Sequence, residues 1–223
     1  MNPDNKESVS IIARVYKVVR DLPQDVSLVG AVKSRSSDEI KYAIAGGLRI
    51  IGYNYVQEAK VQRHLFADVE WHFIGHLQRN KVRTAVQLFD LIQTVDSLEL
   101  ASFISSEACR LDKHMPILIE VNVGREKQKS GVWPERAEEM VKVIAQLPSI
   151  QIEGLMTMGP NLPSGQLRPY FAEAKKLFDH IGSLNITGVR MRYLSMGMSD
   201  SYLVAIEEGA NMVRIGRLLF EEA

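Results

Sequence analysis

Lys33 is the first residue whose position suggests chemistry. An apolar run at residues 28–32 stops at this lysine, and a serine-rich turn follows it. A lysine at the end of a buried strand is either a solvated charge that closes the strand or a primary amine held in a pocket as a nucleophile. The stretch alone favours the solvated charge, because lysines often end strands.

Two segments near the other end of the chain could bind a phosphate group. The segments "SMGMSD" at 195–200 and "VRIGR" at 213–217 place small residues where the chain leaves two apolar runs. Ser199 offers a hydroxyl group and a backbone amide at the start of an expected helix, where an anion is favoured. Gly216 lets the backbone approach a phosphate closely. The alternative is that Ser199 simply caps the helix, as serine commonly does.

Arg214 is a charged residue inside one of these apolar runs, "MVRIG". A guanidinium group buried in a sheet must pair with something. Its partner is either an internal acid, such as Glu120 or Glu153, or a ligand, and the spacing leaves both open. A metal site is not indicated, because His72 and His76 lie four residues apart on an expected strand, without a carboxylate cluster.

The elements that must position these residues alternate along the chain. Helical spacing of apolar residues predicts helices at 8–22, 38–46, 134–147 and 168–182, with Pro134 in a first turn and Gly46 and Gly182 as C-terminal caps. Short apolar runs predict strands at 26–32, 50–54, 71–75, 91–95, 117–123, 150–156, 193–197 and 212–216.

Strands that alternate with helices indicate a parallel sheet, and eight such repeats match a closed (β/α)8 barrel, the TIM barrel fold. We expect one domain over 1–223, with an extra N-terminal helix within 1–24 and the barrel at 25–220. An open doubly wound sheet is the alternative, but no G-x-G-x-x-G motif follows the first strand.

A barrel carries its chemistry at the C-terminal ends of its strands. Lys33 then follows the first strand, while Ser199 and Gly216 follow the seventh and eighth, where barrels often bind phosphate. This placement favours the phosphate interpretation. A lysine and a phosphate site on one rim are what a pyridoxal phosphate pocket needs, because the aldehyde of that cofactor condenses with an amine.

The composition excludes several classes of partner. Lysine plus arginine equals aspartate plus glutamate, at 27 each, so no global basic field attracts nucleic acid or an acidic membrane. Cys109 is the single cysteine, the N-terminus is polar without a signal-peptide core, and no apolar run approaches the roughly 18 residues that span a bilayer. We therefore expect a cytoplasmic protein.

The stretch "WHFIGHLQRNK" at 71–81 resembles a signature of the pyridoxal-phosphate homeostasis proteins. Shorter pieces agree with that family in order and spacing: "GYNYVQE" (52–58), "KSG" (129–131), "GLMTM" (154–158), "LSMGMSD" (194–200) and "VRIG" (213–216). The resemblance extends from about residue 26 to residue 220. It implies a single barrel like the N-terminal domain of alanine racemase.

The resemblance also implies roles for particular residues. Lys33 would form a Schiff base with pyridoxal 5′-phosphate, and Arg214 would face the pyridine nitrogen, which an arginine does not readily protonate. The other implied cofactor-binding residues are Ser199, Gly216 and Arg217 at the phosphate, Met158 against the ring, and Asn54 and Lys129 at the border. Two positions depart from the family: Tyr53 stands where it usually has Glu, and Arg217 replaces a commoner Thr.

Racemisation needs two acid/base groups, one on each face of the substrate, and in alanine racemase a further domain supplies the second. We expect no such domain here and therefore no catalytic residues in this sense. The implied function is a binder that holds pyridoxal phosphate, contributes to intracellular vitamin B6 homeostasis and passes the cofactor to apo-enzymes, as a monomer. The alternatives are a weak pyridoxal-phosphate-dependent amino-acid racemase with a base such as Tyr53, and a phosphate-binding barrel enzyme without this cofactor.

Overall fold

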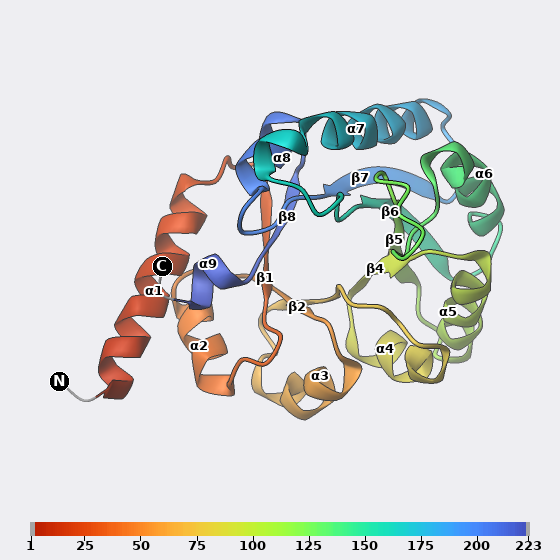
Figure 1. Cartoon of the computed structure of the whole chain (residues 1–223). Coiled ribbons are helices and arrows are strands. Elements are labelled where there is room, and N and C mark those ends of the chain that lie inside the picture. The colour runs from red at the N-terminus through yellow and green to blue at the C-terminus, as the bar shows by residue number, and fades with distance from the viewer. Residues whose placement is uncertain (1–2, 222–223) are drawn as a thin grey trace.

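The computed structural model describes residues 3–221, and in this part of the chain eight parallel strands close into a barrel in the order β1-β2-β3-β4-β5-β6-β7-β8 (Figure 1). The predicted (β/α)8 barrel is therefore confirmed. The strands are β1 (Ser27–Ala31), β2 (Ile50–Tyr53), β3 (Glu70–Phe73), β4 (Leu91–Val95), β5 (Met115–Glu120), β6 (Ile150–Met156), β7 (Val189–Ser195) and β8 (Met212–Ile215).

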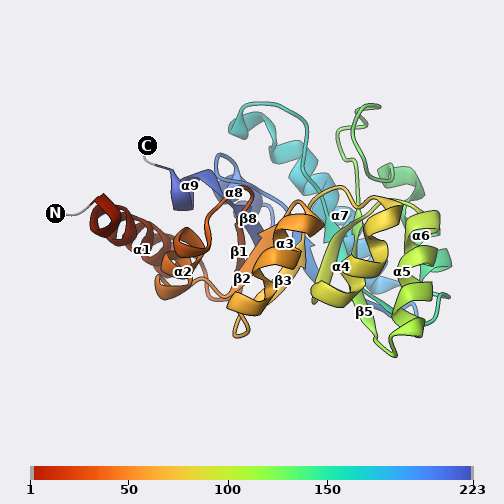
Figure 2. The same ribbon diagram turned by 90° about the horizontal axis from the view of Figure 1, so that it is seen from below.

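The helices surround the strands, and α1 lies outside this ring against α2 and α9 (Figure 1). Seen from below, α1, α2 and α9 lie at one end of the molecule and α5 and α6 at the other (Figure 2). The α-helices are α1 (Pro3–Asp21), α2 (Ser37–Ala45), α3 (Val56–Gln62), α4 (Val82–Leu88), α5 (Leu98–Arg110), α6 (Pro134–Ile144), α7 (Arg168–Ser183), α8 (Tyr202–Glu207) and α9 (Arg217–Phe220). Short 3-10 helices cover Arg63–Leu65, Arg79–Lys81 and Ser164–Gln166.

Two hydrophobic layers hold the barrel together. The larger layer lies between strands and helices, and in it Tyr53 stacks on Trp71 with ring centroids 4.8 Å apart. The smaller layer fills the barrel interior. Its fully or nearly fully buried members are Val29, Ile74, Leu91, Leu118, Met156 and Met212. Because both faces of most strands are covered, most of the strands are near-continuous apolar runs in the sequence, and the exposed first half of β7 is the main exception.

Some predicted boundaries need correction. Gly46 caps α2 and Pro134 lies in the first turn of α6, as predicted. Gly182, however, lies within α7, which continues to Ser183. Strand β7 begins at Val189 rather than at residue 193.

No helix in residues 3–221 is both long enough and apolar enough to cross a bilayer. In the same residues, no group of three or more His, Cys, Asp and Glu side chains gathers in a way that could hold a metal ion. Cys109 is exposed.

Candidate cofactor site

A cavity of about 710 Å³ lies at the rim of the barrel where the strands end. Its lining contains every residue that the sequence analysis singled out for a cofactor. These residues are Lys33, Asn54, Lys129, Met158, Ser199, Arg214, Gly216 and Arg217. They lie at or after the C-terminal ends of six strands, β1, β2, β5, β6, β7 and β8, and the closed barrel brings them together.

The loop after β1 that carries Lys33 has a fixed backbone. Ser34 adopts a left-handed conformation with φ of 60°, which is uncommon for a residue other than glycine. The amide of Ser34 donates a hydrogen bond to the Glu58 carboxylate at 3.3 Å, and the carbonyl oxygen of Arg35 accepts one from Gln62 Nε2 at 3.3 Å. Two side chains of α3 therefore hold the backbone that follows the lysine.

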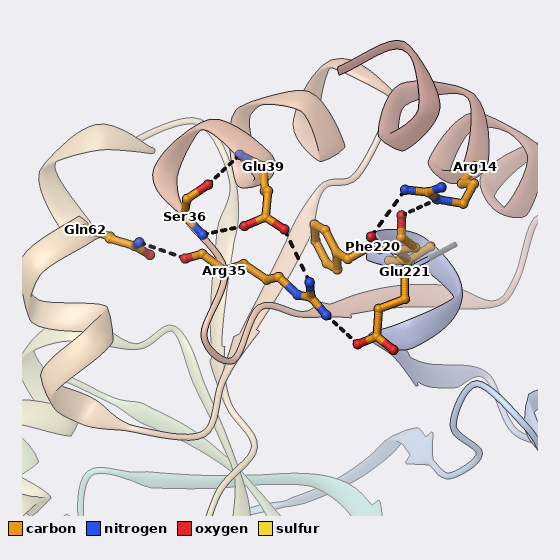
Figure 3. A network of polar contacts seen from close by, with 8 residues as sticks. Arg14, Arg35, Ser36, Glu39, Gln62, Phe220 and Glu221 are labelled. Carbon is orange, nitrogen blue, oxygen red and sulfur yellow. Dashed lines mark hydrogen bonds and ion pairs between the residues drawn. The ribbon is translucent and has the colours of Figure 1, made fainter. Parts of the chain in front are cut away.

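The side chain of Arg35 connects this loop to the end of the described chain (Figure 3). Its guanidinium group donates to Glu39 at 3.3 Å and to Glu221 at 2.6 Å, and it lies 5.1 Å from the ring centroid of Phe220. Arg14 of α1 donates in turn to the carbonyl oxygen of Phe220 at 3.2 Å. The first and last helices of the described chain thus support the lysine loop from outside the barrel.

Lys33 and Asn54 present free polar groups to the cavity. Among the described residues, neither side chain makes a hydrogen bond or ion pair, although the Lys33 ammonium lies 5.5 Å from the ring centroid of Tyr55. The backbone of Asn54 passes so close to Gly75 that a Cβ atom there would lie 2.2 Å from the Asn54 carbonyl oxygen. The glycine of "WHFIGH" therefore permits the approach of the two rim segments.

Arg214 is a buried cation, only 5% exposed, on the floor of the cavity. It donates to Ser195 Oγ at 2.7 Å and to the carbonyl oxygen of Thr157 at 2.9 Å. No carboxylate of the described chain lies within ion-pair distance of it, so neither Glu120 nor Glu153 is its direct partner. Burial lowers the pKa of the Arg214 guanidinium to about 10, which leaves it charged at neutral pH.

The two segments proposed for phosphate lie next to each other at the rim. Ser199 Oγ accepts a hydrogen bond from the Leu218 amide at 3.4 Å, and Arg217 forms an ion pair with Asp200. Ser199 does not open a helix as predicted, because α8 begins at Tyr202 and the segment before it is a turn. The anion-binding argument therefore loses its helix N-terminus and rests on the cavity and its charges.

The remaining two predicted residues lie on the loops that follow β5 and β6. Met158 is exposed, and Lys129 donates to the carbonyl oxygen of Gly159 at 2.9 Å and pairs with Glu126 at 2.5 Å. Both Met158 and Lys129 also line an adjoining cleft of about 220 Å³. That cleft contains Glu120, whose side chain makes no hydrogen bond or ion pair with another residue of the described chain.

The charge of the cavity is positive. Its lining contains five basic side chains, Lys33, Arg35, Lys129, Arg214 and Arg217, and two acidic ones, Asp200 and Glu221. Both acids are already paired, with Arg217 and Arg35 respectively. Within the described residues, Lys33 and Arg214 are the two cations of the lining without a carboxylate partner, so the cavity is suited to an anion.

Sequence reasoning missed part of the lining. The position of Arg35 in the sequence could have identified it, because it lies two residues after Lys33 in the same turn. The direction of its side chain, however, depends on its ion pairs with Glu39 and Glu221. The loop at 159–169 was identified only as a connection, and it contributes Pro160, Asn161 and Leu162. Tyr53, considered as a base, is fully buried under Trp71 and does not line the cavity.

Comparisons with known proteins agree on one family. The family described as "Alanine racemase, N-terminal domain" matches residues 10–222. A pyridoxal phosphate homeostasis protein of Aquifex aeolicus is 41% identical over 198 residues, which cover 87% of this chain and 86% of that protein. A protein of the same name from Escherichia coli is 32% identical over 208 residues, covering 89% and 86%.

Solved structures show the same relationship. PipY of Synechococcus elongatus PCC7942 with pyridoxal phosphate bound superposes with a TM-score of 0.87 at 33% identity, over 94% of this chain and 99% of that one. An alanine racemase of Clostridium difficile superposes with a TM-score of 0.77 at 15% identity, over 98% of this chain but 56% of the racemase, and shares the fold. The chain therefore belongs to the alanine racemase N-terminal domain family and, within it, to the pyridoxal phosphate homeostasis proteins.

Proposed function

We propose that this protein binds pyridoxal 5′-phosphate in the rim cavity through Lys33 and contributes to vitamin B6 homeostasis by holding and releasing the cofactor. One observation carries the proposal. A free primary amine and a buried, uncompensated guanidinium group line the same cavity, in which the acidic side chains are already paired. A buried cation without a carboxylate partner is costly, and an anionic ligand would offset that cost.

The residues present fit this cofactor. Gly216 keeps the wall open at the rim, since a Cβ atom there would lie 3.3 Å from both Cβ and the carbonyl oxygen of Ala31. The Ser199 hydroxyl group and the backbone at Gly216 and Arg217 would hold the phosphate, and Arg217 would add charge at that end. Asn54, Met158 and Lys129 would border the ring.

When bound, pyridoxal phosphate supplies an aldehyde that condenses with a primary amine. The chain's own part is to place the Lys33 amine, which the left-handed turn at Ser34 and the support from α3 hold at the rim. The Arg214 guanidinium group donates hydrogen bonds but does not readily lose a proton, so it would hydrogen-bond to the pyridine nitrogen without protonating it. This favours retention of the cofactor over its use as a strong electron sink.

We further propose that the protein has little or no catalytic turnover. The only tyrosine considered as a second base, Tyr53, is buried away from the cavity, donates its hydroxyl group to Gln62 at 2.6 Å, and has a pKa that burial raises far above its usual value. Relatives at 41% and 32% identity are named homeostasis proteins, which supports the same interpretation. The racemase alternative has no observation in its favour beyond the shared barrel.

Several further expectations belong to the same proposal. The chain would act as one barrel domain over 1–223, in the cytoplasm and as a monomer. Its protein partners would be apo-enzymes that need the cofactor. Neither nucleic acid nor a membrane is expected as a partner, because the formal net charge is zero.

Borohydride reduction followed by peptide mass mapping tests the proposal. The protein is incubated with pyridoxal phosphate, reduced and digested, beside a Lys33→Met variant and a Lys127→Met control in which an exposed lysine outside the cavity is removed. We expect a phosphopyridoxyl adduct on Lys33 in the wild type and the control, and none at residue 33 in Lys33→Met. An unmodified Lys33, or label only on other lysines, would overturn the site assignment.

A further inference from the structure

A row of buried polar side chains crosses the barrel interior beneath the cavity. His72 on β3, Gln93 on β4 and Ser195 on β7 are each 0% exposed, and none of them lines the cavity. They occupy an interior whose buried hydrophobic side chains are aliphatic residues and methionines. Buried polar groups in such surroundings are costly unless every one is hydrogen-bonded, so their arrangement calls for a reason.

Hydrogen bonds join these side chains to Arg214 without a break. Arg214 donates to Ser195 Oγ at 2.7 Å, and Ser195 Oγ donates to Gln93 Oε1 at 2.7 Å. Gln93 Nε2 lies 2.8 Å from His72 Nδ1 and also 3.3 Å from the sulfur of Met212. His72 Nε2 lies 2.8 Å from the carboxylate of Glu70, at the opposite end of the barrel.

Arg214 and the amide group of Gln93 together set the direction of the bonds in this row. A guanidinium group can only donate, so Ser195 Oγ is its acceptor, and Ser195 donates its single hydrogen to the amide oxygen of Gln93 that faces it. Gln93 then accepts through Oε1 and turns its amide nitrogen toward His72. His72 Nδ1 is therefore an acceptor, and its hydrogen resides on Nε2 and points to Glu70. This hydrogen bond lowers the pKa of the Glu70 carboxyl.

We propose that Ser195, Gln93 and His72 are positioning residues of the cofactor site: they orient the Arg214 guanidinium group from inside the barrel, with Glu70 as the anchor at the far end. The inference rests on the proposed function, because Arg214 is taken to face the bound cofactor. Among the residues that the structure describes, the direct partners of Arg214 are the neutral groups of Ser195 and Thr157, so removing one of them frees a buried charged group to turn.

A pair of serine variants tests the proposal. Ser195→Ala removes the link between Arg214 and Gln93. Ser105→Ala is the matched control, since Ser105 is also buried and donates one hydrogen bond at 2.7 Å, to the carbonyl oxygen of Pro148 outside the barrel interior. Both variants should lose thermal stability, Ser195→Ala more than Ser105→Ala, because Ser195 makes two buried hydrogen bonds and one of them comes from a charged group. We expect Ser195→Ala alone to weaken pyridoxal phosphate binding about tenfold and to shift the visible absorption band of the bound cofactor.

Two further variants separate positioning from simple packing. Ser195→Thr keeps the hydroxyl group and should restore the wild-type dissociation constant and band. Gln93→Met preserves the length of the side chain but breaks the row one step farther from the cavity, and it should reproduce the effect of Ser195→Ala. If Ser195→Ala and Gln93→Met bind the cofactor with the wild-type affinity and band, the proposal is wrong.

The inference can also be tested on the wild-type protein, without relying on a variant that folds. Nitrogen NMR of ¹⁵N-histidine-labelled protein should find the hydrogen of His72 on Nε2, and the His72 resonances should move when pyridoxal phosphate is added, although His72 does not line the cavity. The other tautomer, or resonances unmoved by a cofactor that binds, would contradict the inference. A wild-type protein that does not bind pyridoxal phosphate at all would instead overturn the proposed function.

Discussion

Replacing Glu120 with glutamine removes a carboxyl group whose pKa is raised to about 7. Desolvation by burial is the main cause, since the residue is 8% exposed, and the negative charge of Asp96 raises the pKa further. The positive charge of Arg214 lowers it and so opposes both effects. Glu120 lies in the cleft beside the rim cavity, and it changes charge near neutral pH.

The sign of the effect on stability follows from proton linkage. The carboxyl group has a pKa near 4.5 in the unfolded chain and about 7 in the folded one, so the folded state binds more protons between these values. The contribution of Glu120 to the free energy of unfolding is most favourable below the unfolded pKa and is lost as pH rises through 7. At about 1.4 kcal/mol for each pKa unit, the loss amounts to about 3 kcal/mol.

Urea unfolding of the cofactor-free wild type and Glu120→Gln, followed by circular dichroism at pH values from about 4.5 to 8, measures this loss. Glutamine does not titrate, and every other titrating group is common to the two proteins. The difference in the free energy of unfolding between them should therefore move by about 3 kcal/mol in favour of the variant as pH rises. Asp96→Asn serves as a second variant, in which the pKa of Glu120 falls and the pH dependence shrinks.

A difference between wild type and Glu120→Gln that stays constant across this pH range would refute the reasoning. It would mean that Glu120 titrates near its ordinary pKa in the folded protein, and that water or an ion reaches its carboxylate. A difference that moves in the opposite direction would mean that Arg214 outweighs burial and Asp96 together.

Three other substitutions have expected outcomes. Gly154→Ala should cost more than about 3 kcal/mol or prevent folding, because the residue has φ of 144° and a Cβ atom there would lie 1.9 Å from the carbonyl oxygen of Tyr193. The control Gly165→Ala should change the melting temperature little, because no atom lies within 4 Å of a Cβ atom at that position. Equal melting temperatures of the two variants would contradict this prediction. Tyr53→Phe should cost about 1 kcal/mol in urea unfolding, because it removes the 2.6 Å hydrogen bond to Gln62, and a more stable variant would show that this bond is unimportant. Ser36→Ala should also cost about 1 kcal/mol, because it removes the hydroxyl group of the capping box at the start of α2, and an unchanged midpoint would argue against that cap.

Most of the strands could be predicted from the sequence because they are buried on both faces. Strands β4 and β6 match the predicted ranges 91–95 and 150–156 residue for residue. The start of β7 was missed because Arg190 and Arg192 are exposed on it, and these charges interrupt the apolar run. A strand with a solvated end has no continuous hydrophobic signal there.

The site could be predicted less directly. Lys33 and Arg214 could be identified as candidates because they are charged residues at the end of, or within, apolar runs. The roles proposed for them, however, came from the family resemblance. The helix expected at Ser199 fails because the Ser201 hydroxyl group binds the Met198 amide and the turn continues to Tyr202. The row from His72 to Ser195 could not be predicted, since strands buried on both faces do not reveal which residues point into the barrel.

The contact between Arg35 and Glu221 joins residues that are 186 positions apart in the chain. During synthesis, the ribosome adds residues at about 5–20 per second, so the lysine loop leaves it well before the segment that completes the support of that loop. The barrel likewise cannot close until β8 has been synthesised and pairs with β1. A nascent chain therefore exposes the Lys33 amine before the loops after β7 and β8 are in place. If these loops hold the phosphate as proposed, only chains whose synthesis has passed β8 can bind the cofactor.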